Sequence, residues 1–132
     1  MPKYGTGIYS TLQSIGQGDT VQVWSAEQPV AGAGGASASI AVALAGAYGV
    51  GNTGLEVSGF FSGAPGTFEI DVQVSDVDAD TQYQTVANGN ITSVDATNQT
   101  FHFDGSTIKA RFCRLLMRTL TNSVNVTATV GR

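Results

Sequence analysis

Cysteine, charge and histidine are all scarce in this sequence. Cys113 is the only cysteine among 132 residues, which excludes an intrachain disulfide and a cysteine-based zinc cluster and favours a cytoplasmic origin. Charged residues make up only 12% of the chain, about half of the share usual in soluble domains. Low charge removes the like-sign repulsion that keeps molecules apart, so this composition suits a protein that packs against others.

Positive charge is too sparse for a nucleic-acid partner. The formal net charge is −4, whereas the neutralisation of phosphates needs a surplus of Lys and Arg.

No apolar leader follows Met1, so no signal peptide is expected. The segment from Gln28 to Leu55 carries no charge, but its Gly, Ala and Ser content favours a loop that leads into a buried strand over a membrane span.

Apolar and polar residues alternate over several short runs, a period typical of strands with one buried face. The clearest runs are Phe68–Ser75 and Val124–Val130. Turn residues at 64–66, 104–106 and 121–123 separate such runs. The pattern predicts one all-β domain over residues 20–132, an antiparallel β-sandwich or jelly roll. Weaker strand signals lie at 21–23, 40–44, 55–57 and 101–103.

Two segments need a specific interpretation. Asn88-Gly89 supplies the positive φ angles of a type I′ hairpin turn, which would join 82–87 to 90–95 and set Val86 opposite Ile91. Residues 107–120 fit either a strand or an amphipathic helix with its arginines on one face. No strong helix cap precedes them and the neighbouring segments are strands, so we expect a strand with a bulge near Cys113.

Residues 1–19 form a Gly-rich arm outside this strand rhythm. Apolar residues without a strand pattern either fold back over their own domain or reach a neighbouring chain. The candidates for contact with a partner are Tyr4, Ile8, Tyr9, Leu12 and Ile15.

Charge is segregated along the chain. Four of the six basic residues lie within ten positions, from Lys109 to Arg118, whereas six of the ten acids lie between Glu69 and Asp95. One interpretation is that the two sets pair across neighbouring strands of the same fold. The other is that the basic strand meets an acidic edge of a second subunit and fixes the register of an oligomer. The candidates for that contact are Arg111, Arg114 and Arg118.

Three aspartates at alternate positions, Asp76, Asp78 and Asp80, resemble the start of a calcium loop, because hard cations prefer several oxygen ligands. The glycine and glutamate that such a loop needs are replaced by Thr81 and Ala87. A solvated acidic turn is therefore the favoured interpretation, with a divalent ion as the weaker one.

Residue types that commonly act in catalysis or bind metals are also few, because the sequence has one histidine and one cysteine. His102, the only histidine, lies between Phe101 and Phe103, so a strand would turn it away from the two aromatics and out of the core. Cys113 fits a small buried hydrophobe. We therefore expect no catalytic residues, no metal centre and no cofactor.

Three aromatic residues suggest an alternative function. Trp24, Tyr48 and Tyr83 could form a platform on which sugar rings stack, which would make the domain a carbohydrate-binding module. Packing in the core or at an interface is the commoner role of such residues.

A resemblance to a known family lies in Phe68–Val74, the Asp-rich turn after it, and Ala110–Leu116 leading to Val124–Thr127, which together cover roughly the C-terminal half of the chain. In these stretches the chain resembles the small capsid decoration or cement proteins of tailed bacteriophages. It implies a virion protein, made in the host cytoplasm, that forms trimers or other small oligomers. It also implies that these oligomers bind the major capsid protein between capsomers, with the arm as an anchor. A tail or fibre subunit has a similar composition and stays an alternative.

Overall fold

The computed structural model describes residues 13–15, 20–44, 54–105, 108 and 110–131. Within these residues the chain forms nine strands and two short 3-10 helices, and no helix is long and apolar enough to cross a membrane. The strands are β1 (Gln13–Ile15), β2 (Thr20–Glu27), β3 (Val42–Leu44), β4 (Leu55–Phe61), β5 (Phe68–Ser75), β6 (Gln84–Ile91), β7 (Thr100–Gly105), β8 (Phe112–Leu120) and β9 (Val126–Gly131), and the 3-10 helices are η1 (Gly35–Ser37) and η2 (Asp80–Gln82).

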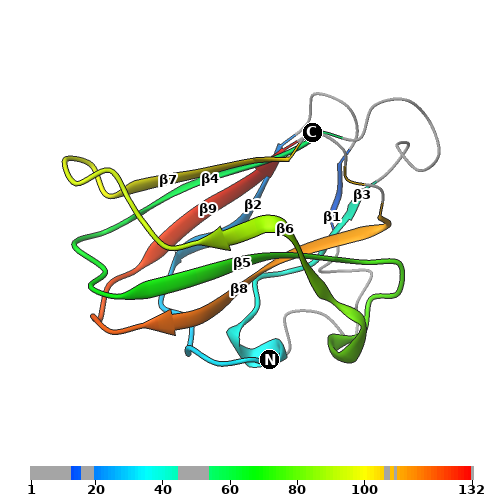
Figure 1. Ribbon diagram of the computed structural model, residues 1–132, viewed down its shortest axis with the longest axis horizontal. Helices are drawn as coiled ribbons and strands as arrows, with labels where there is room; N and C mark the ends of the chain where they lie inside the picture. The colour runs from blue at the N-terminus through cyan, green and yellow to red at the C-terminus, as the bar shows by residue number, and fades with distance from the viewer. Residues whose placement is uncertain (1–12, 16–19, 45–53, 106–107, 109, 132) are drawn as a thin grey trace.

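The strands form two sheets that pack face to face (Figure 1), in the orders β1-β3-β8-β5-β6 and β2-β9-β4-β7. Strands β2 to β9 pair in a nested series, β2 with β9, β3 with β8, β4 with β7 and β5 with β6, and every one of these pairs is antiparallel. Eight strands nested in this way across two sheets make a jelly roll. The predicted all-β class is therefore confirmed, and the strand order selects the jelly roll from the two alternatives.

Apolar side chains from both sheets fill the space between them. Trp24 from β2, Val57 from β4, Val72 from β5 and Leu115 from β8 are fully buried in one continuous core. At one end of it the rings of Phe61 and Phe68 meet edge to face, 4.9 Å between centroids, and Phe101 packs on both. Each fully buried side chain of this size contributes about 1.5–3 kcal/mol through the hydrophobic effect.

Strands β5 and β8 are buried on both faces, which the alternation in β5 did not predict. Asp71, Gln73 and Ser75, expected to face solvent, are buried. The segment between β2 and β3 runs beside β8, where the Ser39 N–H donates to the Leu115 carbonyl at 2.8 Å and the Leu115 N–H donates to Ser39 Oγ at 3.0 Å. A polar layer lies on the outer side of the five-stranded sheet, where Asp80 of the loop between β5 and β6 accepts a hydrogen bond from Arg114.

The hairpin predicted at Asn88-Gly89 is wrong. Both flanking segments belong to one strand, β6, and both pair with β5, as Thr85 does with Gln73 and Asn90 with Asp71. Residues 86–89 therefore lie opposite the single residue Val72 of β5 and form a bulge with three extra residues, in which Asn88 adopts a φ of 61°. The positive φ that Asn tolerates therefore serves a bulge inside a strand. Both halves of β6 pair with β5, and they do not pair with each other as a hairpin would require.

Residues 112–120 form strand β8 rather than a helix, as predicted. The predicted bulge near Cys113 lies elsewhere: the register against β5 shifts between the Glu69–Thr119 and Ile70–Met117 pairs, which leaves Arg118 as the extra residue. Cys113 itself is fully buried in the core, in regular register with Val74.

Candidate binding surfaces

Arg114 joins three elements on the outer side of the five-stranded sheet. Its side chain on β8 is only 1% exposed. Nε donates to Gln73 Oε1 on β5 at 2.9 Å, and Nη1 donates to Asp80 Oδ1 on η2 at 2.8 Å. The guanidinium carbon lies 4.2 Å from the centroid of the Tyr83 ring, and the Tyr83 hydroxyl donates to Asp78 Oδ1 at 2.7 Å. Arg114 therefore ties the loop between β5 and β6 onto the sheet.

Arg118, four residues further along β8, makes a second ion pair within the chain. Its Nε donates to Asp71 Oδ2 on β5 at 2.7 Å, and Nη2 contacts the same oxygen. Asn90 Nδ2 on β6 donates to the other oxygen, Oδ1, at 2.6 Å. The buried carboxylate of Asp71 is thereby bound from both neighbouring strands.

These pairs decide between the two interpretations of the charge segregation for two of the arginines. Arg114 and Arg118 pair with acids of neighbouring elements in the same chain. Arg114 is buried, so its assignment to a contact with a partner is wrong; burying its charge is favourable only because acceptors in the same chain match it. Arg111, the third candidate, is exposed.

Two of the three aspartates that resemble the start of a calcium loop contact residues of the same chain. Asp80 binds Arg114, Asp78 accepts the Tyr83 hydroxyl, and Asp76 is exposed. Among the described residues, no group of three His, Cys, Asp or Glu side chains is arranged to hold a metal ion. The acidic turn is explained by its contacts within the fold.

Most of the predicted arm lies outside the described residues, including Tyr4, Ile8, Tyr9 and Leu12. Ile15 belongs to β1, which pairs in parallel with β3 through Ile15 and Leu44. Part of the segment predicted as an arm is therefore a strand at the edge of the five-stranded sheet.

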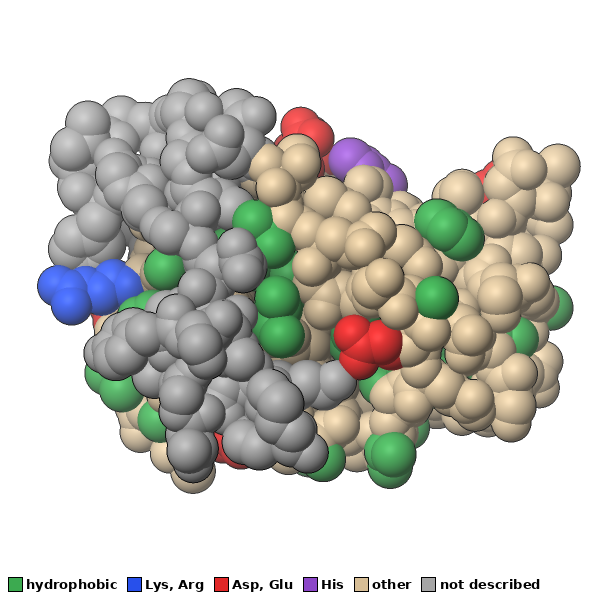
Figure 2. Space-filling view, turned by 180° about the vertical axis from the view of Figure 1, so that it is seen from behind, with side chains coloured by type: hydrophobic (Ala, Val, Ile, Leu, Met, Phe, Trp, Pro, Cys, Tyr) green, Lys and Arg blue, Asp and Glu red, His purple; other side chains and the backbone are tan. Residues whose placement is uncertain are grey.

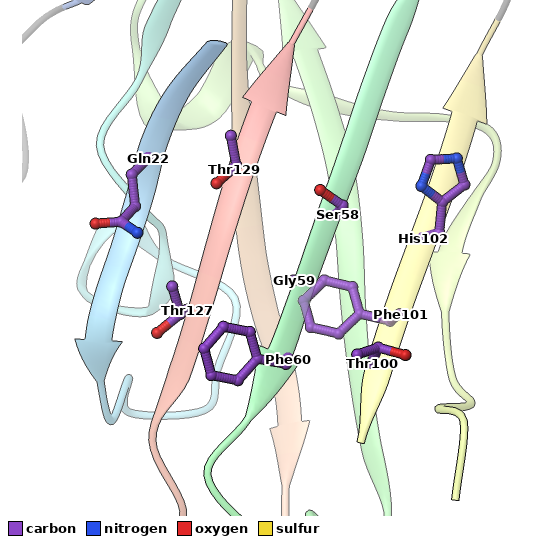
Figure 3. Close-up of a pocket in the computed structure, with 9 residues that line it drawn as sticks. All are labelled: Gln22, Ser58, Gly59, Phe60, Thr100, Phe101, His102, Thr127 and Thr129. Atoms are coloured by element: carbon purple, nitrogen blue, oxygen red, sulfur yellow. The ribbon is translucent and has the colours of Figure 1, made fainter. Parts of the chain in front are cut away.

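A different surface emerges on the four-stranded sheet, whose outer face carries a shallow open hollow of about 490 Å³ (Figure 3). Two cross-strand rows of side chains line it. One row runs Gln22–Thr129–Ser58–His102 across β2, β9, β4 and β7, and the other runs Thr127–Phe60–Thr100 across β9, β4 and β7. Figure 3 shows the two rows lying side by side along the strands.

Gly59 and Phe101 complete the lining. A Cβ at position 59 would lie 2.4 Å from the Thr127 carbonyl oxygen and 2.5 Å from Cζ of Phe101. Only glycine therefore fits between the Phe101 ring and strand β9, and this close packing holds the three strands beneath the hollow together.

The hollow contains no Asp, Glu, Lys or Arg among its nine lining residues. The side shown in Figure 2 carries few acidic or basic side chains, but exposed Glu56 and Asp104 pair in register next to Ser58 and His102, at the border of the hollow. His102 lies here on the outer face, opposite to Phe101 and Phe103, as predicted. It is separated by the core from Cys113, so the two cannot act together as a nucleophile and its base.

Only part of this surface was visible in the sequence. The alternation in β9 and the position of His102 placed Thr127, Thr129 and His102 on an outer face. Phe60 was missed because it is followed by Phe61, and two adjacent aromatics do not reveal which one points outward. The platform predicted from Trp24, Tyr48 and Tyr83 does not form as proposed, since Trp24 and Tyr83 are buried and Tyr48 lies outside the described residues.

Comparisons with known proteins give little resemblance. No protein-family model matches the chain, and no curated protein matches it. Among solved structures, the chain is similar to the pre-peptidase C-terminal domain of a collagenase from Bacillus anthracis, with a TM-score of 0.41 and 12% identity over 90% of this chain and 93% of that one.

Proposed function

We propose that the protein is a non-catalytic structural component of a bacteriophage virion, specifically a decoration or cement protein of the capsid. The observation that carries the proposal is the jelly-roll strand order, an architecture that recurs in viral capsid domains. Fold alone does not define a function. The distribution of charge adds an argument that is independent of the fold.

Most of the positive charge in the described part of the chain stabilises the fold. Only three of the described residues are basic, and two of them, Arg114 and Arg118, pair with acids of the same chain. The remaining surface can form contacts without desolvating many charges, a step that is costly unless each charge is paired. Many identical weak contacts of this kind bind strongly when the copies are arranged symmetrically on a lattice.

The arm is the proposed anchor. Residues 1–12 precede β1, which lies at the edge of the five-stranded sheet, and they contain four of the apolar and aromatic residues expected to contact a partner. A second copy of the chain, in a trimer or another small oligomer, and the major capsid protein are the proposed partners. The proposed location is the virion.

The direct test is to locate the protein in purified virions of its source with an antibody raised against the recombinant chain. Immunogold labelling of heads supports a decoration protein, whereas labelling of tails or fibres would replace it with another virion component. Absence of the protein from purified particles would refute a virion role. Light scattering of the recombinant chain, with and without residues 1–12, measures whether the arm promotes assembly.

A further inference from the structure

We infer that the hollow on the outer face of the four-stranded sheet is a binding site for a neutral oligosaccharide. None of the nine described residues that line it belongs to the proposed anchor. Three features of the hollow point to this ligand: the polarity of its lining, one exposed aromatic ring and the spacing between its strands.

The lining matches a neutral ligand that is rich in hydroxyl groups. Ser58, Thr100, Thr127 and Thr129 present hydroxyls, Gln22 an amide and His102 an imidazole. Hydroxyls and amides can both donate and accept hydrogen bonds, as sugar hydroxyls do. A phosphorylated or sulfated ligand would require Lys or Arg, and a cation would require carboxylates, but the lining contains neither.

These polar groups point outward and are mostly not used inside the fold. Thr127 Oγ1 accepts a hydrogen bond from the Ala26 N–H at 3.1 Å, which leaves its own hydroxyl hydrogen to donate. Within the described chain no side-chain hydrogen bond is seen for Ser58, Thr100 or Thr129. A ligand would therefore displace water from these groups without breaking contacts that hold the sheet together.

Phe60 supplies the apolar surface on which a sugar ring can stack. Its side chain is 47% exposed, and it is the only aromatic among the large exposed hydrophobics of the described residues, beside Val30 and Val77. In register it lies between Thr127 and Thr100. An aromatic face flanked by hydroxyls fits a pyranose, which has an apolar face and a polar rim.

The strand spacing gives the site its length. Neighbouring strands lie about 4.8 Å apart, so the row from Gln22 to His102 spans roughly 14 Å across four strands. This length suits a short oligosaccharide lying across the sheet. A second copy of the chain is a less suitable occupant, because a stable interface of two proteins requires a broad matching surface and this hollow offers one exposed ring.

The test is NMR titration of the ¹⁵N-labelled chain with neutral trisaccharides of glucose, galactose, mannose and N-acetylglucosamine. One of them should shift the amides of residues 58–60, 100–102 and 127–129. An open site with a single aromatic ring predicts weak binding, with a Kd on the order of 1 mM. Phe60→Ala should weaken this binding about tenfold or more, whereas the matched control Val77→Ala, at a residue that is 57% exposed outside the hollow, should not change it.

Three outcomes would overturn the inference. They are no shift at these amides with any of the four sugars, shifts that Phe60→Ala does not reduce, and shifts of the same amides that depend on protein concentration in the absence of sugar. The last outcome would identify a second copy as the occupant.

Thr100→Val, which removes one exposed hydroxyl and keeps the shape, provides a second variant. It should weaken the binding while its unfolding transition matches that of the unaltered chain. None of these results bears on whether the protein is present in virions.

Discussion

The ion pair between Arg114 and Asp80 can be tested with a double-mutant cycle of Arg114→Met, Asp80→Asn and the double variant. Methionine fills most of the space of the arginine stem but removes the hydrogen bonds to Gln73 and Asp80. The cycle isolates the coupling between the two side chains from the other contacts of Arg114.

The burial of the two side chains sets bounds on the coupling energy between Arg114 and Asp80. Exposed ion pairs contribute 0.2–1 kcal/mol, roughly, and removing one partner of a fully buried pair costs about 3–5 kcal/mol. Arg114 is 1% exposed but the Asp80 side chain is 50% exposed, so we expect a coupling energy of about 1–2 kcal/mol. Arg114→Met should cost more in total, about 2–3 kcal/mol, because Gln73 also loses its donor while it stays buried.

The assay is urea unfolding followed by tryptophan fluorescence. Trp24 is the only tryptophan and is fully buried in the core, so its emission reports the loss of packing between the two sheets. Asp76→Asn, at an exposed carboxylate of the same loop, is the matched control and should change the stability by less than about 0.5 kcal/mol. A coupling energy below about 0.3 kcal/mol, or a control as destabilised as Asp80→Asn, would refute this account of the pair.

Three further predictions concern positions at which the backbone or the core permits little change. Gly59→Ala should destabilise the fold by about 2–3 kcal/mol in the same assay, because the new methyl group meets the Thr127 carbonyl and the Phe101 ring; a neutral result would contradict the close packing. Asn88→Val should cost about 1–2 kcal/mol and Asn88→Gly almost nothing, since φ is 61°; equal stabilities would rule out a bulge with this conformation. The Cys113 thiol, fully buried, should react with a thiol reagent only when the protein opens, so labelling that is fast in the native state and unaffected by urea would disprove its burial.

The strands were predictable because each has a local signature, whereas their order was not. Alternation places Phe68, Ile70 and Val72 on one face whatever the neighbouring strand is. The pairing of β2 with β9 joins segments that are about a hundred residues apart in the chain, and no periodicity within either segment encodes it. The choice between a general sandwich and a jelly roll therefore had to come from the structure.

The errors share a physical cause, since each involves a residue whose role depends on a distant partner. Asn88-Gly89 has the local chemistry of a hairpin turn, but β5 pairs with both of its flanks. Asp71 and Gln73 have the polarity of solvent-facing positions, yet both are buried, where Arg118 binds Asp71 and Arg114 binds Gln73. The segregation of charge was visible in the sequence, but the burial that makes these pairs internal was not.

The candidate site was hidden for a different reason. Ser, Thr and Gln at exposed strand positions are the usual covering of a sheet, so Ser58, Thr100 and Thr129 show nothing unusual one at a time. Their significance comes from the register, which brings them together around Phe60. The neighbouring Phe61 points into the core, so a pair of identical residues conceals one core residue and one surface residue.

The two sheets differ in what their outer faces can do, and this difference allows both proposals to hold at once. The outer side of the five-stranded sheet is covered by loops tied down through Arg114, and its edge carries β1, which the arm precedes. The hollow lies on the opposite side of the sandwich, on the four-stranded sheet. An attachment confined to the side of the five-stranded sheet would therefore leave the hollow open to solvent, and a copy bound to a capsid in that way could still bind an oligosaccharide.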